Sequence, residues 1–87
     1  MSVVEETLKE RGSVYGPFDK ESEMVAHIMF TLIGHKPISQ INYVAFHTAQ
    51  MIATKLVRAF NGDITYVDNW HDMAGYATLA EKHFKDI

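Results

Sequence analysis

The 87-residue sequence contains no cysteine and no run of about 20 apolar residues, the length that crosses a bilayer as a helix. Without cysteine, neither a disulfide framework nor a thiolate zinc site can form. The first residues do not combine a positive segment with an apolar stretch, as a signal peptide would. These absences predict a cytoplasmic protein that has no membrane partner.

An excess of basic residues is also absent. Eleven Asp and Glu outnumber eight Lys and Arg, which gives a formal net charge of −3. Because binding to a phosphate backbone depends on clustered Lys and Arg, DNA is not an expected partner. The motifs GxxxxGK and GxSxG do not occur, which excludes P-loop chemistry and the common serine acyl-enzyme designs.

What is present is a high apolar content, 47% of the residues. A chain of this length forms one domain, residues 1–87, and a small domain buries a small fraction of its surface. The apolar content exceeds what four short helices need for a core of their own. We therefore expect a homo-oligomer, in which a second copy covers part of the apolar surface.

Helix signals divide the chain into four segments and predict an all-α, four-helix domain. Ser2 and Glu5 form a capping box, so the first helix is expected over residues 3–11, with its end at Gly12. Residues 12–17 (GSVYGP) are too rich in Gly and Pro for a helix interior. They predict a structured loop.

The second and third helices follow from apolar residues at helical spacing. Asp19 is expected to cap the second helix, which ends at Gly34. Ser39 is expected to cap a long third helix that reaches about Phe60, before residues 61–63 (NGD) end it. Apolar residues cover most of the circumference of the third helix, which predicts a central, mostly buried element.

The last helix is expected to begin at Asp68, which can cap it. Residues 64–67 (ITYV) alternate like a strand but have no pairing partner, so they predict an extended linker. Gly75 in mid-helix costs about 1 kcal/mol relative to Ala and predicts close approach of a neighbouring helix. The residues expected to line one apolar face of this helix are Trp70, Met73, Ala74, Ala77, Ala80 and Phe84.

Lys55 lies within the apolar arc of the third helix, where a charge needs a partner. Asp68 and Asp72, one turn apart at the start of the last helix, are the candidate partners. In the alternative, the stem of Lys55 packs on the core while its ammonium group reaches solvent. Thr48, two turns earlier, either adds to a polar notch or donates to the carbonyl of the preceding turn.

Asp68 and Asp72 are also candidate Mg²⁺ ligands, because carboxylates at positions i and i+4 can share a divalent cation. His47 and Gln50, on the polar stripe of the third helix, are candidates to face the same cleft. The alternative is structural: Asp68 is a helix cap, Asp72 is an acid in a first turn, and His71 is exposed.

Arg11 and Tyr15 flank the Gly-containing loop and are candidates to hydrogen-bond and stack on a ligand. In the alternative, Tyr15 packs over the core and closes it.

Three stretches of the sequence are distinctive: residues 10–16 (ERGSVYG), residues 51–58 (MIATKLVR) and residues 61–77 (from NGD to DNWHDMAGYA). Together these three stretches resemble a family of small phage and prophage proteins of unassigned function. The resemblance implies residence in the cytoplasm of a bacterial host.

That family is in turn similar to the all-α nucleoside triphosphate pyrophosphohydrolases of the MazG type. In those enzymes, two acidic pairs on two helices hold Mg²⁺ against the triphosphate while water attacks. The resemblance implies that Asp68 and Asp72 are the counterparts of the second pair. His47 and Gln50 occupy the positions expected for the first pair, so the chain departs from the pattern that hydrolysis requires.

Two hypotheses follow from the residues and the resemblance. In the first, the chain is a degenerate relative that binds a nucleotide-type ligand without hydrolysing it, with Asp68 and Asp72 holding any Mg²⁺. The ligand-binding residues are then Arg11, Tyr15, Lys55, Arg58 and Trp70. If the chain is an enzyme, it is a Mg²⁺-dependent pyrophosphohydrolase and Asp72 is catalytic. In the second hypothesis, a non-enzymatic phage protein binds and inhibits a host defence or metabolic protein.

Overall fold

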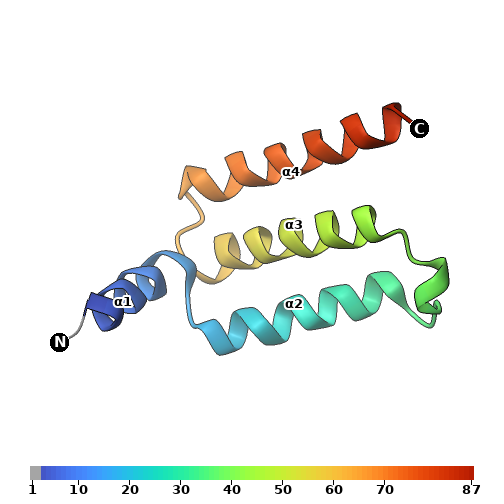
Figure 1. Ribbon diagram of the computed structural model, residues 1–87. Helices are drawn as coiled ribbons and strands as arrows, with labels where there is room; N and C mark the ends of the chain where they lie inside the picture. Colours follow the sequence, from blue (N-terminus) through green and yellow to red (C-terminus); the bar gives the residue numbers. More distant parts are fainter. Residues whose placement is uncertain (1–2) are drawn as a thin grey trace.

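A computed structural model describes residues 3–87, which form four α-helices and one short 3₁₀ helix (Figure 1). No strand occurs in these residues, so the expected all-α fold is confirmed. None of the described helices is long and apolar enough to cross a membrane. The elements in chain order are α1 (Val3–Tyr15), α2 (Phe18–Ile33), η1 (Ile38–Gln40), α3 (Tyr43–Asn61) and α4 (Val67–Lys85).

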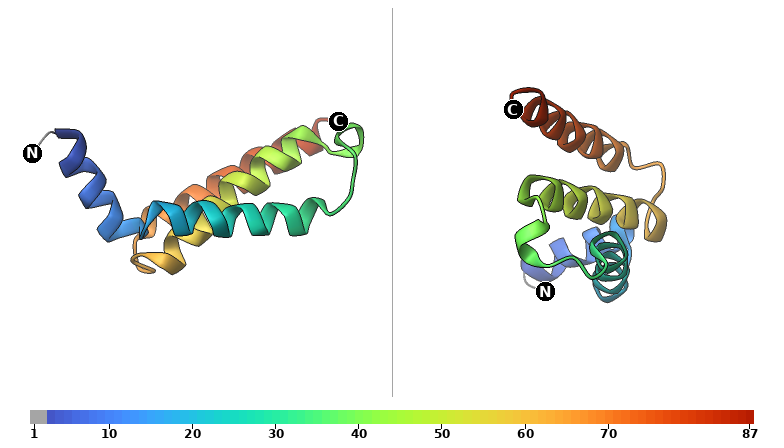
Figure 2. Two further views of the ribbon diagram at one scale, coloured as in Figure 1. Left: turned by 90° about the horizontal axis from the view of Figure 1, so that it is seen from below. Right: turned by 90° about the vertical axis from the view of Figure 1, so that its right-hand side faces the viewer.

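The central element is α3, which lies between α2 and α4 (Figure 1). Along the chain, α2 and α3 run in opposite directions, and so do α3 and α4. The remaining helix, α1, packs mainly against α3 and projects away from the other three helices (Figure 2). The molecule is therefore elongated, with extents of 48 × 27 × 23 Å.

The first helix is longer than expected, because it continues through Gly12 to Tyr15. The amide of Gly16 still donates to the carbonyl of Gly12 at 3.0 Å, so the helical ladder extends across the segment predicted as a loop. Gly16 then adopts a φ of +85°, a value that glycine reaches without strain, and this ends the helix. The expected cap Ser2 lies outside the described residues.

The predicted cap of α2 is also corrected. Pro17 occupies the N-cap position with an extended backbone, and its carbonyl accepts from the amide of Glu21 at 3.0 Å. Asp19 lies in the first turn instead, where its negative charge complements the helix dipole. The predicted end at Gly34 is confirmed, since its amide donates to Phe30 at 2.9 Å.

The third helix starts later than predicted. Ser39 belongs to η1, and the N-cap of α3 is Asn42, whose Oδ1 accepts from the amide of Ala45 at 2.9 Å. Asn42 can perform this role because its short side chain reaches the free amides of the first turn. The predicted end is confirmed: α3 stops at Asn61, and Gly62 follows it as the C-cap.

Residues 64–67 were expected to form an extended linker, because apolar and polar residues alternate there. The segment before α4 is a turn instead. Asp63 organises this turn, because its Oδ1 accepts both the amide and the hydroxyl of Thr65, at 2.9 and 2.6 Å. These hydrogen bonds lower the pKa of Asp63. Tyr66 becomes the N-cap residue of α4, so Asp68 lies in the first turn and is not the cap.

The apolar core of a single chain is small. Among the described residues, its buried apolar side chains are Met29, Ala53, Val57 and Ala59. Three of these belong to α3, and most other residues of that helix are half-buried or exposed. The extensive burial expected for the third helix is therefore not found within one chain.

The tightest contact in the fold joins the end of α1 to the end of α3. The amide of Asp63 donates to the carbonyl of Val14 at 2.8 Å, which brings two backbone segments together. A Cβ atom at Gly62 would overlap that carbonyl, and one at Gly16 would press on the backbone of Asn61. Glycine is required at both positions, and the contact fixes where α1 leaves the other helices.

Candidate functional site

The junction where α1 ends, α2 begins and α3 ends holds a largely buried ion pair. Arg58 donates from Nε to Oε1 of Glu21 at 2.6 Å, and the two side chains are only 24% and 10% exposed. The guanidinium carbon of Arg58 lies 4.6 Å from the centre of the Tyr15 ring, within range of a cation–π interaction. Glu21 and Tyr15 thus hold the arginine in a fixed position.

Tyr15 is held in turn by a second aromatic ring. Its ring meets that of Tyr66 edge to face, with the centroids 5.9 Å apart. A hydrogen bond between the Tyr66 phenol and Asp68 raises the pKa of Tyr66. The predicted residue Asp68 therefore belongs to the outer edge of this aromatic cluster, through Tyr66.

A groove of about 570 Å³ opens at this junction. Its charged lining residues are two arginines, Arg11 and Arg58, and one acid, Glu21, so it carries a positive balance within an acidic chain. The remaining lining residues are apolar or small: Leu8, Gly12, Tyr15, Gly16, Pro17 and Phe18. This volume lies within the range typical of small-molecule sites.

The structure therefore brings together three of the five residues expected to bind a ligand: Arg11, Tyr15 and Arg58. Trp70 does not line this groove. Its indole nitrogen donates to the carbonyl of Ile64 at 2.9 Å, which ties the start of α4 to the preceding turn. Tyr15 combines both roles considered for it, since it lines the groove and packs within the aromatic cluster.

Lys55 lies on another side of α3 and meets one of its two expected partners. Its Nζ is 2.8 Å from Oδ2 of Asp72. This hydrogen bond from Lys55 lowers the pKa of the Asp72 carboxyl. Thr48 forms no notch with this pair, because its hydroxyl donates to Val44 in the preceding turn at 2.7 Å. The alternative interpretation of Thr48 is thus confirmed.

The proposed metal ligands do not form a metal cluster within one chain. Asp72 is engaged by Lys55, whereas Asp68 is next to Tyr66. No group of three or more His, Cys, Asp or Glu side chains gathers among residues 3–87. His47 and Gln50 are exposed on α3. A Mg²⁺ site at these two aspartates therefore stays a prediction, with no third protein ligand in the described chain.

Two buried polar residues, Glu21 and Asn69, were not predicted from the sequence. Glu21 had a detectable signal: it precedes Val25 by four residues and Met29 by eight, so the helical period places it on the apolar face of α2. Asn69 had none, because asparagine in a first turn is ordinarily exposed. It is 1% exposed, and its side-chain atoms have no hydrogen-bond partner among the described residues.

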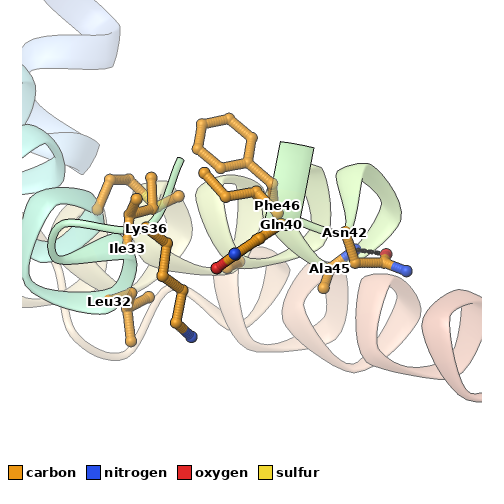
Figure 3. A pocket seen from close by; sticks show the side chains of 10 residues that line it. Leu32, Ile33, Lys36, Gln40, Asn42, Ala45 and Phe46 are labelled. Atoms are coloured by element: carbon orange, nitrogen blue, oxygen red, sulfur yellow. Dashed lines mark hydrogen bonds between the residues drawn. The ribbon is translucent and has the colours of Figure 1, made fainter. Parts of the chain in front are cut away.

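A second groove, of about 370 Å³, lies between α2, η1 and the start of α3 (Figure 3). Most of its lining is apolar, including Met29, Leu32 and Phe46. The only charged lining residue is Lys36. Figure 3 shows the Asn42 cap bonded to Ala45 at one end of the groove. The groove offers little polar chemistry for orienting a ligand, and the junction groove is the stronger candidate.

The model of one protein family, DUF6378, described as a domain of unknown function, matches residues 2–83. This match spans nearly the whole chain, so the chain belongs to that family. The family description carries neither a phage origin nor a pyrophosphohydrolase activity. No curated protein and no solved structure matches the chain.

Proposed function

We propose that the protein binds a small anionic ligand of the nucleotide type in the junction groove. The observation that supports this most directly is the position of Arg58, fixed between Glu21 and the Tyr15 ring at the wall of a groove that Arg11 also lines. A fixed guanidinium is well suited to a phosphate or carboxylate, since little side-chain entropy is lost on binding.

The two arginines have different roles in this proposal. Arg58 uses Nε for Glu21, and its planar guanidinium carries further N–H donors. Arg11 lies on the exposed surface of α1 and supplies the second positive charge. The exposed ring of Phe18, 78% accessible, provides an apolar surface for a flat base. A ligand with a negative group and a ring would use all three.

Binding without hydrolysis is the form of the proposal that the residues favour. Lys55 already neutralises Asp72, the residue proposed as catalytic if the chain were an enzyme. His47 and Gln50 stand where a pyrophosphohydrolase of the MazG type has acids, and two acids alone bind Mg²⁺ poorly. In this proposal, the protein is a phage-type accessory protein and a degenerate relative of those enzymes.

Calorimetry with a panel of nucleoside mono-, di- and triphosphates, with and without Mg²⁺, tests the proposal. We expect binding by the native chain and at least about tenfold weaker binding by Arg11→Gln, because a charged hydrogen bond is lost. Lys9→Gln is the matched control: it also removes one exposed positive charge from α1, but Lys9 does not line the groove. No binding to any member of the panel, or equal losses in both variants, would contradict the proposal.

The second candidate function is binding to a host protein through α1. This helix projects from the other three and carries Val4 and Leu8 one turn apart, 67% and 61% exposed. Exposed apolar side chains on a projecting helix can fill the groove of a partner. A stoichiometric bacterial protein captured by the native chain and lost with Val4→Lys, together with no affinity for nucleotides, would favour this function.

A further inference from the structure

Most of α1 is uncovered. Of the four described α-helices, α1 alone has no buried residue. Every residue from 3 to 13 is exposed, and only Val14 and Tyr15 at the end of the helix are half-buried. The apolar side chains of Val4 and Leu8 are 67% and 61% exposed. Figure 2 shows this part of α1 extending away from the three packed helices. Packing therefore supports mainly the last turn of α1.

The sequence of α1 does not compensate for this lack of packing. Isolated helices shorter than about 12–15 residues are marginal in water even when they are rich in alanine, and α1 has 13 residues and no alanine. Its weak helix formers, more than half of the total, are Val3, Val4, Thr7, Gly12, Ser13, Val14 and Tyr15. We therefore expect the exposed part of α1 to unfold locally while the other helices stay folded.

The last turn of α1, in contrast, is firmly attached. The carbonyl of Val14 accepts from the amide of Asp63 at 2.8 Å, and the ring of Tyr15 packs within the aromatic cluster. The amide of Gly16 donates to the carbonyl of Gly12 at 3.0 Å, which closes one helical turn. This turn is a nucleus from which the rest of α1 can fold, one residue at a time, without a new nucleation step.

One face of the exposed part of α1 forms a wall of the junction groove. Four of the lining residues belong to α1 and share one helical face: Leu8, Arg11, Gly12 and Tyr15. The opposite wall is fixed by the ion pair of Arg58 and Glu21, with 2.6 Å between Nε and Oε1. Leu8 and Arg11 face this wall only while the helix continues back from Tyr15. The groove therefore has one fixed wall and one wall that depends on the folding of α1.

We propose that residues 3–11 of α1 are a lid, which is partly unfolded in the free protein and folds when a nucleotide-type ligand enters the junction groove. This inference rests on the ligand proposed for that groove. A ligand between Arg11 and Arg58 contacts both walls, so it favours the state in which residues 3–11 are helical. The apparent affinity is then reduced by the fraction of free molecules whose lid is unfolded. Ligand affinity and the stability of α1 are thus linked.

Amide hydrogen exchange measured by NMR tests the lid directly. In the free chain, we expect protection of residues 8–11 to be at least about a hundredfold lower than that of residues 53–57, in the packed part of α3. The probe is the tightest binder among the nucleoside mono-, di- and triphosphates of the calorimetric panel. At saturation with it, protection of residues 8–11 should rise at least about tenfold. Residues 82–85 are the control, because this exposed end of α4 does not line the groove and its protection should not change.

The possible results separate the lid from the ligand site. Equal protection of residues 8–11 and 53–57 in the free chain would overturn the lid, while calorimetric binding would still support the ligand site. Nucleotide binding that brings no new protection to residues 8–11 would overturn the lid in the same way. If no nucleotide binds, the proposed function fails and the lid fails with it, because nothing then folds this part of α1.

Two variants at position 9 provide a second measurement. Lys9 is exposed and does not line the groove. Lys9→Ala and Lys9→Gly remove the same charge and differ in helix propensity. We expect Lys9→Gly to bind the nucleotide about two- to fivefold more weakly than Lys9→Ala, because fewer molecules have a folded lid, while their urea unfolding midpoints differ little. Equal affinities together with a lower midpoint for Lys9→Gly would show that α1 unfolds only with the rest of the chain, and would overturn the lid.

Discussion

Two cations three residues apart on α3 reach opposite neighbours, and their surroundings differ. Arg58 turns toward α1 and α2, where Glu21, Tyr15 and a groove surround it. Lys55 turns toward α4 and meets Asp72, whose side chain is 40% exposed. Sequence periodicity makes Lys55 the unusual residue and Arg58 an ordinary member of a polar stripe. Both cations are enclosed, with the Lys55 side chain 14% and the Arg58 side chain 24% exposed, and the difference lies in their acids, because Glu21 is 10% exposed and Asp72 is 40% exposed.

The backbone is also packed more closely on the side of α3 that carries Arg58 than on the side that carries Lys55. On the side of Arg58, Gly62 lets the end of α3 touch the carbonyl of Val14. On the side of Lys55, Gly75 has open space around it. The α1 side is therefore joined by a close backbone contact, while the α4 side is joined by side chains. A preformed ligand site fits the first environment.

Substituting the two glycines should produce the largest contrast between these sides. Gly62→Ala forces a methyl group onto the Val14 carbonyl and is expected to reduce the free energy of unfolding by about 3 kcal/mol. Gly75→Ala meets no atom and improves helix propensity, so it should increase that free energy by about 1 kcal/mol. Urea unfolding of both variants measures the two changes in free energy. Equal changes would show that Gly62 and the Val14 carbonyl are not in tight contact.

The two acids of α2 provide the next largest contrast. Glu21→Gln leaves Arg58 without its charged partner in a largely buried setting and is expected to cost about 2 kcal/mol of unfolding free energy. Glu23→Gln removes the same charge from an exposed residue, 3.8 Å from His27, and is expected to cost less than about 0.5 kcal/mol. Chemical denaturation of both variants checks this order. A loss in Glu23→Gln that matches the loss in Glu21→Gln would count against a special role for the junction pair.

The smallest effect is expected for the Lys55–Asp72 pair, and it depends on pH. Because the pKa of Asp72 is lowered by the hydrogen bond from Lys55, its stabilising contribution is present above the unfolded-state pKa of about 3.9. That contribution is lost as the pH falls through the lower folded-state pKa. The melting temperature of native protein should therefore exceed that of Asp72→Asn at about pH 6, and the difference should shrink toward about pH 3.

The pKa of Asp63 is also lowered, so Asp63 contributes to the pH dependence of the melting temperature as well. This contribution is the same in the native chain and in Asp72→Asn, so it cancels in the difference between them at each pH. A difference in melting temperature that stays constant or grows on acidification would contradict the assigned sign.

The sequence predicted the fold class and the ends of α2 and α3, because Gly34 and residues 61–63 are strong local stop signals. It misplaced the starts of α2, α3 and α4. Asp19, Ser39 and Asp68 all have the chemistry of a cap, but the chain turned at Pro17, Asn42 and Tyr66 instead. Cap preference is a local property, whereas the backbone angle at which a helix starts depends on how neighbouring helices pack.

The site was predicted in part. Arg11, Tyr15 and Arg58 were named and do line one groove, because the stretches that contain them meet at the ends of α1 and α3. Glu21 was not predicted as a site residue, although it lines the groove. Lys55 and Trp70 were predicted to bind the ligand, but they do not line the groove. Helical periodicity shows which residues share a face of one helix. It does not show which face of another helix they meet.

The most direct test of the account is to map the ligand on the protein by amide chemical shifts during titration with a nucleoside triphosphate. The account predicts that the largest shift changes fall on residues of the junction, Gly12, Tyr15, Gly16 and Phe18. The start of α4, around Asp68 and Asp72, should change little. Shift changes concentrated at Asp68 and Asp72, or none anywhere at saturating nucleotide, would contradict the central claim that the junction groove is the binding site.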